Sequence, residues 1–131
     1  GYDTCIFLNE VGKVAEGPGS CFFMVKGDTL ITPRLTDSVL ESITRDTIIK
    51  LATEELGLKF QERTIDRTEV YMANEAFLCG SAMEITPIYT IDRYSIGTGV
   101  QGEITKRLHM TYLDCVTGKL ENRKDWLTSI Y

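Results

Sequence analysis

The chain has 131 residues, and its 43% apolar and 25% charged content is typical of a globular domain or of part of a larger protein. A net charge of −5 argues against a nucleic-acid-binding surface, and no apolar run approaches the roughly 20 residues of a membrane-spanning helix. Four cysteines without a C-x-x-C pair and a single histidine leave little from which to build a metal site, so we expect a cytoplasmic protein with reduced thiols.

The first part of the chain predicts short strands that are separated by turns. The sequence starts at Gly1 without a methionine and enters a strand-like run almost at once, so we expect a fragment of a longer protein. Strand-forming residues gather in four runs, at 5–8, 14–17, 21–26 and 29–32.

The first helix is predicted over 47–56, where apolar residues recur at helical spacing and Gly57 suits a left-handed C-terminal cap. A polar turn at 40–46 leads into it, and we expect Arg45 and Asp46 to pair on the helix surface. A helix N-terminus presents unpaired N–H groups and a positive partial charge. The turn is therefore a candidate anion site, although an ordinary capped helix has the same pattern.

The second half of the chain alternates strand and helix patterns. Asp66-x-x-Glu69 predicts a capping box that opens a short helix through Tyr71. A last helix follows residue 103 and ends before Gly118. Further strands are predicted at 59–65, at 75–85 with a break at 80–82, and at 87–92. The tally predicts an α+β fold with a curved mixed sheet or pseudo-barrel and about three helices.

Three local features could take part in chemistry. Glu16 stands where a strand breaks at 17–19, so its carboxylate is either solvated or free to pair with a protonated ring nitrogen. Thr44 offers a hydroxyl and backbone N–H groups at the helix start. Gly80-Ser81-Ala82 is either a bulge or a second donor-rich turn that a ligand approaches closely. His109 is expected on the surface, and one histidine cannot complete a Ser/His/Asp set.

Four stretches, taken together and in this order, resemble the motifs of the class IV (fold-type IV) pyridoxal-phosphate-dependent aminotransferases. The resemblance covers nearly the whole chain and is greatest to the C-terminal domain of the branched-chain amino acid aminotransferases. The stretches are Val14-Ala15-Glu16-Gly17-Pro18-Gly19, Ser42-Ile43-Thr44-Arg45-Asp46, Asp66 through Phe77, and Gly80-Ser81-Ala82-Met83-Glu84-Ile85-Thr86-Pro87.

The resemblance implies a role for each matching residue in holding pyridoxal 5'-phosphate. Glu16 would pair with the pyridine nitrogen and Leu40 would pack on the ring. Ser81 and Ala82 would also present N–H groups to the substrate carboxylate. The phosphate would be held at two turns, by Ser42, Ile43 and Thr44 and by Gly80 and Ser81.

The chain departs from the family pattern at several positions. Ser42 stands where the family usually has glycine, so we expect backbone strain there if that position needs a positive φ. Ser20-Cys21 replaces a more frequent Glu-Asn or Ser-Asn pair, and Met83 replaces a small residue. The family's Schiff-base lysine lies upstream of the segment that matches Gly1, so no catalytic residue is expected in this chain and the fragment alone is expected to be inactive.

The implied parent transfers the amino group of leucine, isoleucine or valine to 2-oxoglutarate and is a homodimer or larger. A D-amino acid aminotransferase or an aminodeoxychorismate lyase would share the cofactor motifs. A non-catalytic phosphate-ligand-binding or assembly domain is the alternative from another class.

Overall fold

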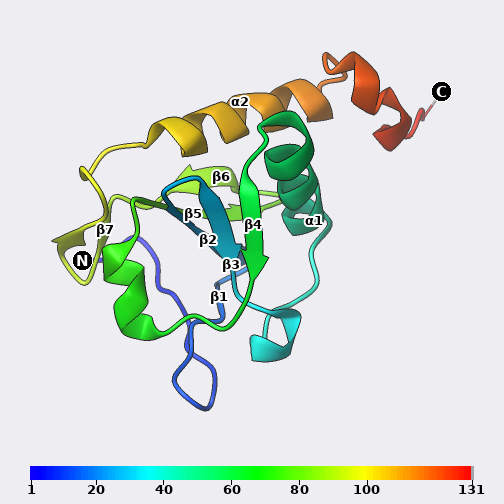
Figure 1. The fold of residues 1–131 in the computed structure, drawn as a ribbon. Coiled ribbons are helices and arrows are strands. Elements are labelled where there is room, and N and C mark those ends of the chain that lie inside the picture. The colour runs from blue at the N-terminus through cyan, green and yellow to red at the C-terminus, as the bar shows by residue number, and fades with distance from the viewer. Residues whose placement is uncertain (131) are drawn as a thin grey trace.

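A computed structural model describes residues 1–130 and shows an α+β fold built on one mixed sheet, as predicted (Figure 1). The sheet has six strands in the order β4-β3-β2-β5-β6, with β1 also pairing with β2. Only β3 and β4 run parallel. The strands are β1 (Glu16–Gly17), β2 (Ser20–Lys26), β3 (Thr29–Thr32), β4 (Lys59–Glu62), β5 (Glu75–Gly80) and β6 (Glu84–Pro87).

Strand β2 is the centre of the sheet because it pairs with β1 and β3 along one edge and with β5 along the other. Its apolar run is buried on both faces, which explains why it reads as continuous rather than alternating. Phe23 and Val25 face the helices, and Phe23 stacks on Phe77 of β5 with ring centroids 5.2 Å apart. Phe22 and Met24 face the opposite side and pack in a second apolar cluster.

The helices α1 (Ile43–Lys50) and α2 (Glu103–Val116) cover one face of the sheet, with α2 crossing above β5 and β6 (Figure 1). α1 continues into a π-helical turn, η2 (Leu51–Glu55), and the chain leaves it through Gly57 with φ +65°. Short 3₁₀ turns lie at η1 (Leu35–Asp37), η3 (Arg67–Met72) and η4 (Glu121–Trp126). None of the helices in 1–130 is both long and apolar enough to span a bilayer.

The N-terminus of α2 is capped by a residue from the sheet rather than from its own turn. The Glu75 carboxylate on β5 accepts the N–H groups of Ile104 and Thr105, at 3.1 and 2.7 Å, and the Thr105 hydroxyl at 2.6 Å. A Cβ on Gly102 would lie 1.9 Å from the Glu75 carboxyl carbon, so only glycine fits beside this cap. The contact fixes α2 to the first residue of β5.

Several expectations for individual elements were wrong. The first helix begins at Ile43, four residues before the apolar pattern, because Ser42 caps it there. Asp66 makes no capping hydrogen bond; it pairs with Lys13, while Glu69 pairs with Arg63. The segment expected as one strand at 87–92 is divided: Pro87 ends β6, and β7 (Thr90–Ile91) forms a hairpin with β8 (Tyr94–Ser95). The run at 5–8 forms no strand and makes only an isolated bridge between Leu8 and Val14.

Candidate functional site

A cavity of about 540 Å³ lies where β1, β2 and β5 meet the start of α1. Its size is within the range of small-molecule sites. The sheet register explains which residues reach it, because Glu16 pairs with Cys21 and Cys21 pairs with Cys79. The full lining is Glu16, Gly19, Ser20, Cys21, Leu40, Glu41, Ser42, Ile43, Cys79, Gly80, Ser81 and Ala82.

The start of α1 gives the cavity a positive wall. The Ser42 side chain accepts the Arg45 N–H at 3.2 Å, and the Ser42 carbonyl accepts the Asp46 N–H at 3.1 Å. The N–H groups of Ile43 and Thr44 precede these first bonds and have no intrahelical acceptor. With the helix dipole they favour an anion at this wall. Ser42 has φ −139°, an ordinary extended conformation, so the strain expected there is absent.

Glu16 is held in place by the chain that leads into α1. One oxygen of its carboxylate accepts the Leu40 N–H at 2.9 Å. Among residues 1–130 no donor contacts its other oxygen, which remains able to accept a hydrogen bond from a ligand. The same contact brings the apolar Leu40 side chain to the cavity, where it is 74% exposed. A carboxylate and an apolar side chain therefore stand together at one wall.

The turn after β5 lines the cavity with Gly80, Ser81 and Ala82. Gly80 approaches Gly19 so closely that a Cβ would lie 2.9 Å from the Gly19 carbonyl oxygen. This glycine is thus required by strand packing, whatever the cavity binds. Beyond it Ser81 and Ala82 are exposed. Ser20, also in the lining, has a buried hydroxyl without a hydrogen-bond partner in the described part of the chain, which is a polar atom free for a ligand.

Seven of the eight predicted site residues line this one cavity; the exception is Thr44. The buried Thr44 side chain instead forms a hydrogen bond with Tyr112 of α2, and burial raises the pKa of the Tyr112 hydroxyl. Its backbone N–H remains part of the helix start. Arg45 was expected on the surface with Asp46, but its guanidinium is buried and pairs with Glu62 at 2.8 Å, away from the cavity.

Sequence reasoning missed the two cysteines of the lining. Cys21 and Cys79 are buried residues on neighbouring strands, and a hydrogen bond between their thiols, opposed by burial, lowers the pKa of Cys21 to about 7. The same hydrogen bond and burial raise the pKa of Cys79. The register of β2 on β5 sets this pairing, and no local pattern reports it.

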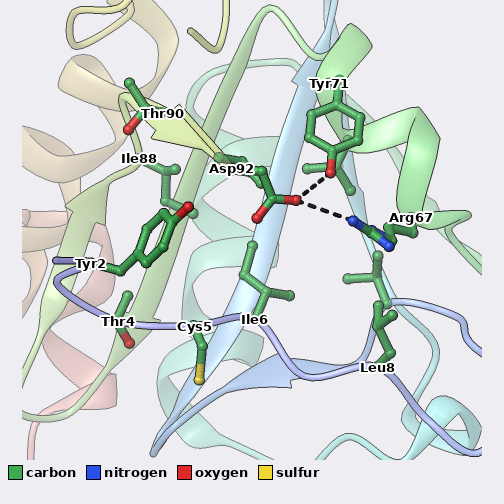
Figure 2. A pocket seen from close by; sticks show the side chains of 13 residues that line it. Tyr2, Thr4, Cys5, Ile6, Leu8, Arg67, Tyr71, Ile88, Thr90 and Asp92 are labelled. Carbon is green, nitrogen blue, oxygen red and sulfur yellow. Dashed lines mark hydrogen bonds and ion pairs between the residues drawn. The ribbon is translucent and has the colours of Figure 1, made fainter. Parts of the chain in front are cut away.

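A second cavity, of about 430 Å³, lies between the N-terminal segment, η3 and β7 (Figure 2). Figure 2 shows its charged groups gathered at one side, where Asp92 accepts hydrogen bonds from Tyr71 and from Arg67. The hydrogen bond from Tyr71, and to a smaller extent the hydrogen bond from Arg67, lower the pKa of Asp92. Because these groups satisfy one another, the first cavity is the better candidate site. Within residues 1–130 no cluster of three or more histidine, cysteine or acidic side chains could hold a metal ion.

Comparison with known proteins identifies the family to which the chain is similar. The family model described as amino-transferase class IV matches residues 1–91. The chain is 46% identical to a probable branched-chain-amino-acid aminotransferase of Aquifex aeolicus over 131 residues, which is all of this chain but 42% of the relative.

Solved structures agree with this likeness. The branched-chain amino acid aminotransferase of Thermobaculum terrenum in its PLP-form is 55% identical with a TM-score of 0.95, over 98% of this chain and 42% of that one. The branched-chain aminotransferase of Thermoproteus uzoniensis with norvaline is 45% identical with a TM-score of 0.93, over 100% of this chain and 43% of that one.

Proposed function

The chain belongs to the class IV aminotransferases, and we propose that it forms the cofactor-binding C-terminal domain of a branched-chain amino acid aminotransferase. It spans 42% of the length of its Aquifex aeolicus relative, so the proposed activity is that of a longer protein. The observation that carries the proposal is the single cavity onto which Glu16, the start of α1 and the 80–82 turn all open.

The donors around this cavity suit the phosphate of pyridoxal 5'-phosphate. We assign phosphate binding to Ser42, Ile43 and Thr44 at the start of α1 and to Gly80 and Ser81 at the end of β5. The N–H groups at the helix start carry no intrahelical bond, and the helix dipole attracts the negative charge. The orphaned Ser20 hydroxyl is a further group that a ligand would satisfy.

The carboxylate of Glu16 suits the ring nitrogen of the same cofactor. When bound, pyridoxal phosphate supplies a conjugated ring that takes up electrons from the substrate α-carbon. Glu16 would keep a proton on the ring nitrogen, because an adjacent carboxylate favours the charged heterocycle. The Leu40 N–H holds that carboxylate in place at 2.9 Å, and the Leu40 side chain, which also lines the cavity, would pack on the ring.

Substrate binding is assigned to the exposed end of the turn, where Ser81 and Ala82 offer N–H groups to an α-carboxylate. The substrates proposed for the longer protein are leucine, isoleucine or valine and 2-oxoglutarate. We assign the Schiff-base lysine to the part of that protein outside this chain. Leu40 and Ile43, which are 74% and 89% exposed, support a site that is completed by a further domain or a second subunit of a homo-oligomer.

The test is made on the full-length protein, by following glutamate formation from L-leucine and 2-oxoglutarate. Glu16→Gln keeps an acceptor for the Leu40 N–H but removes the charge, so we expect the rate to fall at least about 100-fold, the lower end of what a positioned proton contributes. Glu10→Gln, at an exposed glutamate in the 9–13 turn, is the matched control. Equal rates in the two variants would contradict the role of Glu16.

The same assay separates the alternative functions. Activity with D-alanine or with aminodeoxychorismate, and not with L-leucine, would assign the protein to another branch of the family. Absence of activity with all three substrates, together with binding of pyridoxal phosphate, would favour a non-catalytic ligand-binding domain. The chain of residues 1–131 alone is expected to form no glutamate above the enzyme-free rate.

A further inference from the structure

Two thiols face each other across adjacent strands at the wall of the candidate cofactor cavity. Cys21 of β2 and Cys79 of β5 are direct partners in the antiparallel register. Both side chains are buried, and both residues line the cavity, which gives a small solute a route to them. The function proposed above gives neither of them a role.

The geometry of the pair is compatible with a disulfide. Residues directly opposite each other in antiparallel strands have Cα atoms about 4.5–5.5 Å apart, within the range of about 4.4–6.8 Å that disulfides span. Their Cβ atoms lie about 4.5–5.5 Å apart, at or just beyond the upper limit for a disulfide. The bond would therefore form with a small approach of the strands, and such strained bonds are easily reduced.

The surroundings of the two sulfur atoms make their roles unequal. Hydrogen bonds from the Cys79 thiol and from the Ser42 hydroxyl stabilise a thiolate on Cys21, whereas burial and the charge of Glu16 oppose it. The resulting pKa of Cys21 is about 7. Cys79 stays protonated, since its pKa is raised by the hydrogen bond to Cys21 and by burial. A thiolate is the form that reacts with electrophiles. Cys21 is thus the attacking group and Cys79 the resolving one.

We propose that Cys21 and Cys79 are a reversible redox pair that a hydroperoxide, such as hydrogen peroxide, converts to a disulfide. The Cys21 thiolate attacks one peroxide oxygen, the O–O bond breaks, and hydroxide leaves as a sulfenic acid forms on Cys21. The Cys79 sulfur then attacks the Cys21 sulfur; the S–S bond forms, the S–O bond breaks, and water leaves with the Cys79 proton. The two sulfurs lose two electrons, which reduce the peroxide.

The disulfide would change the cavity itself. The Cys21 thiol contacts the Leu40 carbonyl oxygen at 3.9 Å and the Ser42 hydroxyl, so it touches the segment that positions Glu16 and begins α1. Cys79 directly precedes the Gly80 turn. A bond between the two sulfurs removes the Cys21 thiol from these contacts. The inference depends on the register and the cavity and is independent of the identity of the bound ligand.

The experiment treats the full-length protein with hydrogen peroxide, blocks free thiols with an alkylating agent and maps the peptides by mass spectrometry. We expect a Cys21–Cys79 linked peptide that dithiothreitol abolishes. In Cys79→Ser the link is lost and Cys21 is trapped by dimedone as a sulfenic acid. Cys115→Ser, at a buried thiol outside the cavity, leaves the link unchanged. Circular dichroism verifies that each sample remains folded.

The pH dependence of the reaction gives a second readout. Between pH 6 and pH 8 the thiolate fraction of a group with a pKa of about 7 rises about 10-fold, compared with roughly 80-fold for an ordinary thiol of pKa near 8.5. We expect the rate of Cys21 oxidation to follow the smaller rise. The proposal is overturned if both cysteines stay alkylatable when the exposed Cys5 is fully oxidised, or if the link forms only in unfolded protein.

Discussion

The cap that Glu75 makes on α2 gives the most direct test of how the sheet holds its covering helix. Replacing Glu75 with alanine removes the acceptor of three hydrogen bonds from Ile104 and Thr105. Loss of a single N-cap contact costs about 0.5–2 kcal/mol. Because a charged acceptor serves three donors here, we expect a cost of about 2–3 kcal/mol in the local stability of α2.

The measurement is native-state hydrogen exchange of the amides of α2, because a cost of 2 kcal/mol accelerates exchange by local opening about 30-fold. Glu75→Gln is expected to behave much like Glu75→Ala, since its single oxygen cannot accept from all three donors and its amide N–H₂ meets further donors. Glu103→Gln, in the exposed first turn of α2, is the control. Exchange rates of the α2 amides in Glu75→Ala within about twofold of those in this control would show that the Glu75 cap does not stabilise α2.

Two further changes test other contacts. The hydrogen bond and ion pair with Arg63 lower the pKa of Glu69, so this pair stabilises the fold above the unfolded-state pKa of about 4.3 and ceases to do so as pH falls through the folded-state pKa. Glu69→Gln is therefore expected to lower the free energy of unfolding by about 1 kcal/mol at pH 7 and by progressively less as the pH falls below about 4, as measured with urea. A loss that does not change with pH would contradict this. Gly80→Ala places a Cβ 2.9 Å from the Gly19 carbonyl oxygen, so we expect the end of β5 to shift. The affinity for pyridoxal phosphate, measured by fluorescence titration, is then expected to fall about 10-fold. Unchanged affinity would show that the turn tolerates the shift.

Elements specified by local pattern were predicted well from the sequence. β3 has the expected bounds, and α2 ends before Gly118 as expected, where φ is +73°. The hairpin of β7 and β8 was missed because its turn uses Asp92 and Arg93 at positive φ, where the recognisable signal would be glycine or asparagine. The capping box failed because Asp66 pairs with Lys13, which is distant in the sequence, and Glu69 pairs with Arg63, which precedes the turn.

The residues of the candidate site also differ in how far the sequence predicted them. The helix start and the 80–82 turn are local features, and their proposed residues were accessible to pattern and resemblance. The contacts that these residues make with distant parts of the chain could not be predicted from the sequence. The thiol pair at Cys21 and Cys79 follows from the register of β2 on β5, and the Leu40 N–H on Glu16 joins residues that lie 24 positions apart in the sequence.

The central place of β2 in the sheet also constrains how the chain folds as it is synthesised. β2 and β3 form a hairpin as soon as Thr32 has been made, but the other edge of β2 needs β5, which ends at Gly80. At about 5–20 residues per second, making the roughly 50 residues between them takes about 3–10 s. During that interval the apolar edge from Cys21 to Val25 is open to other unpaired strands. Slow translation of this stretch would thus favour aggregation of the nascent protein, and a chaperone that covers the edge would oppose it.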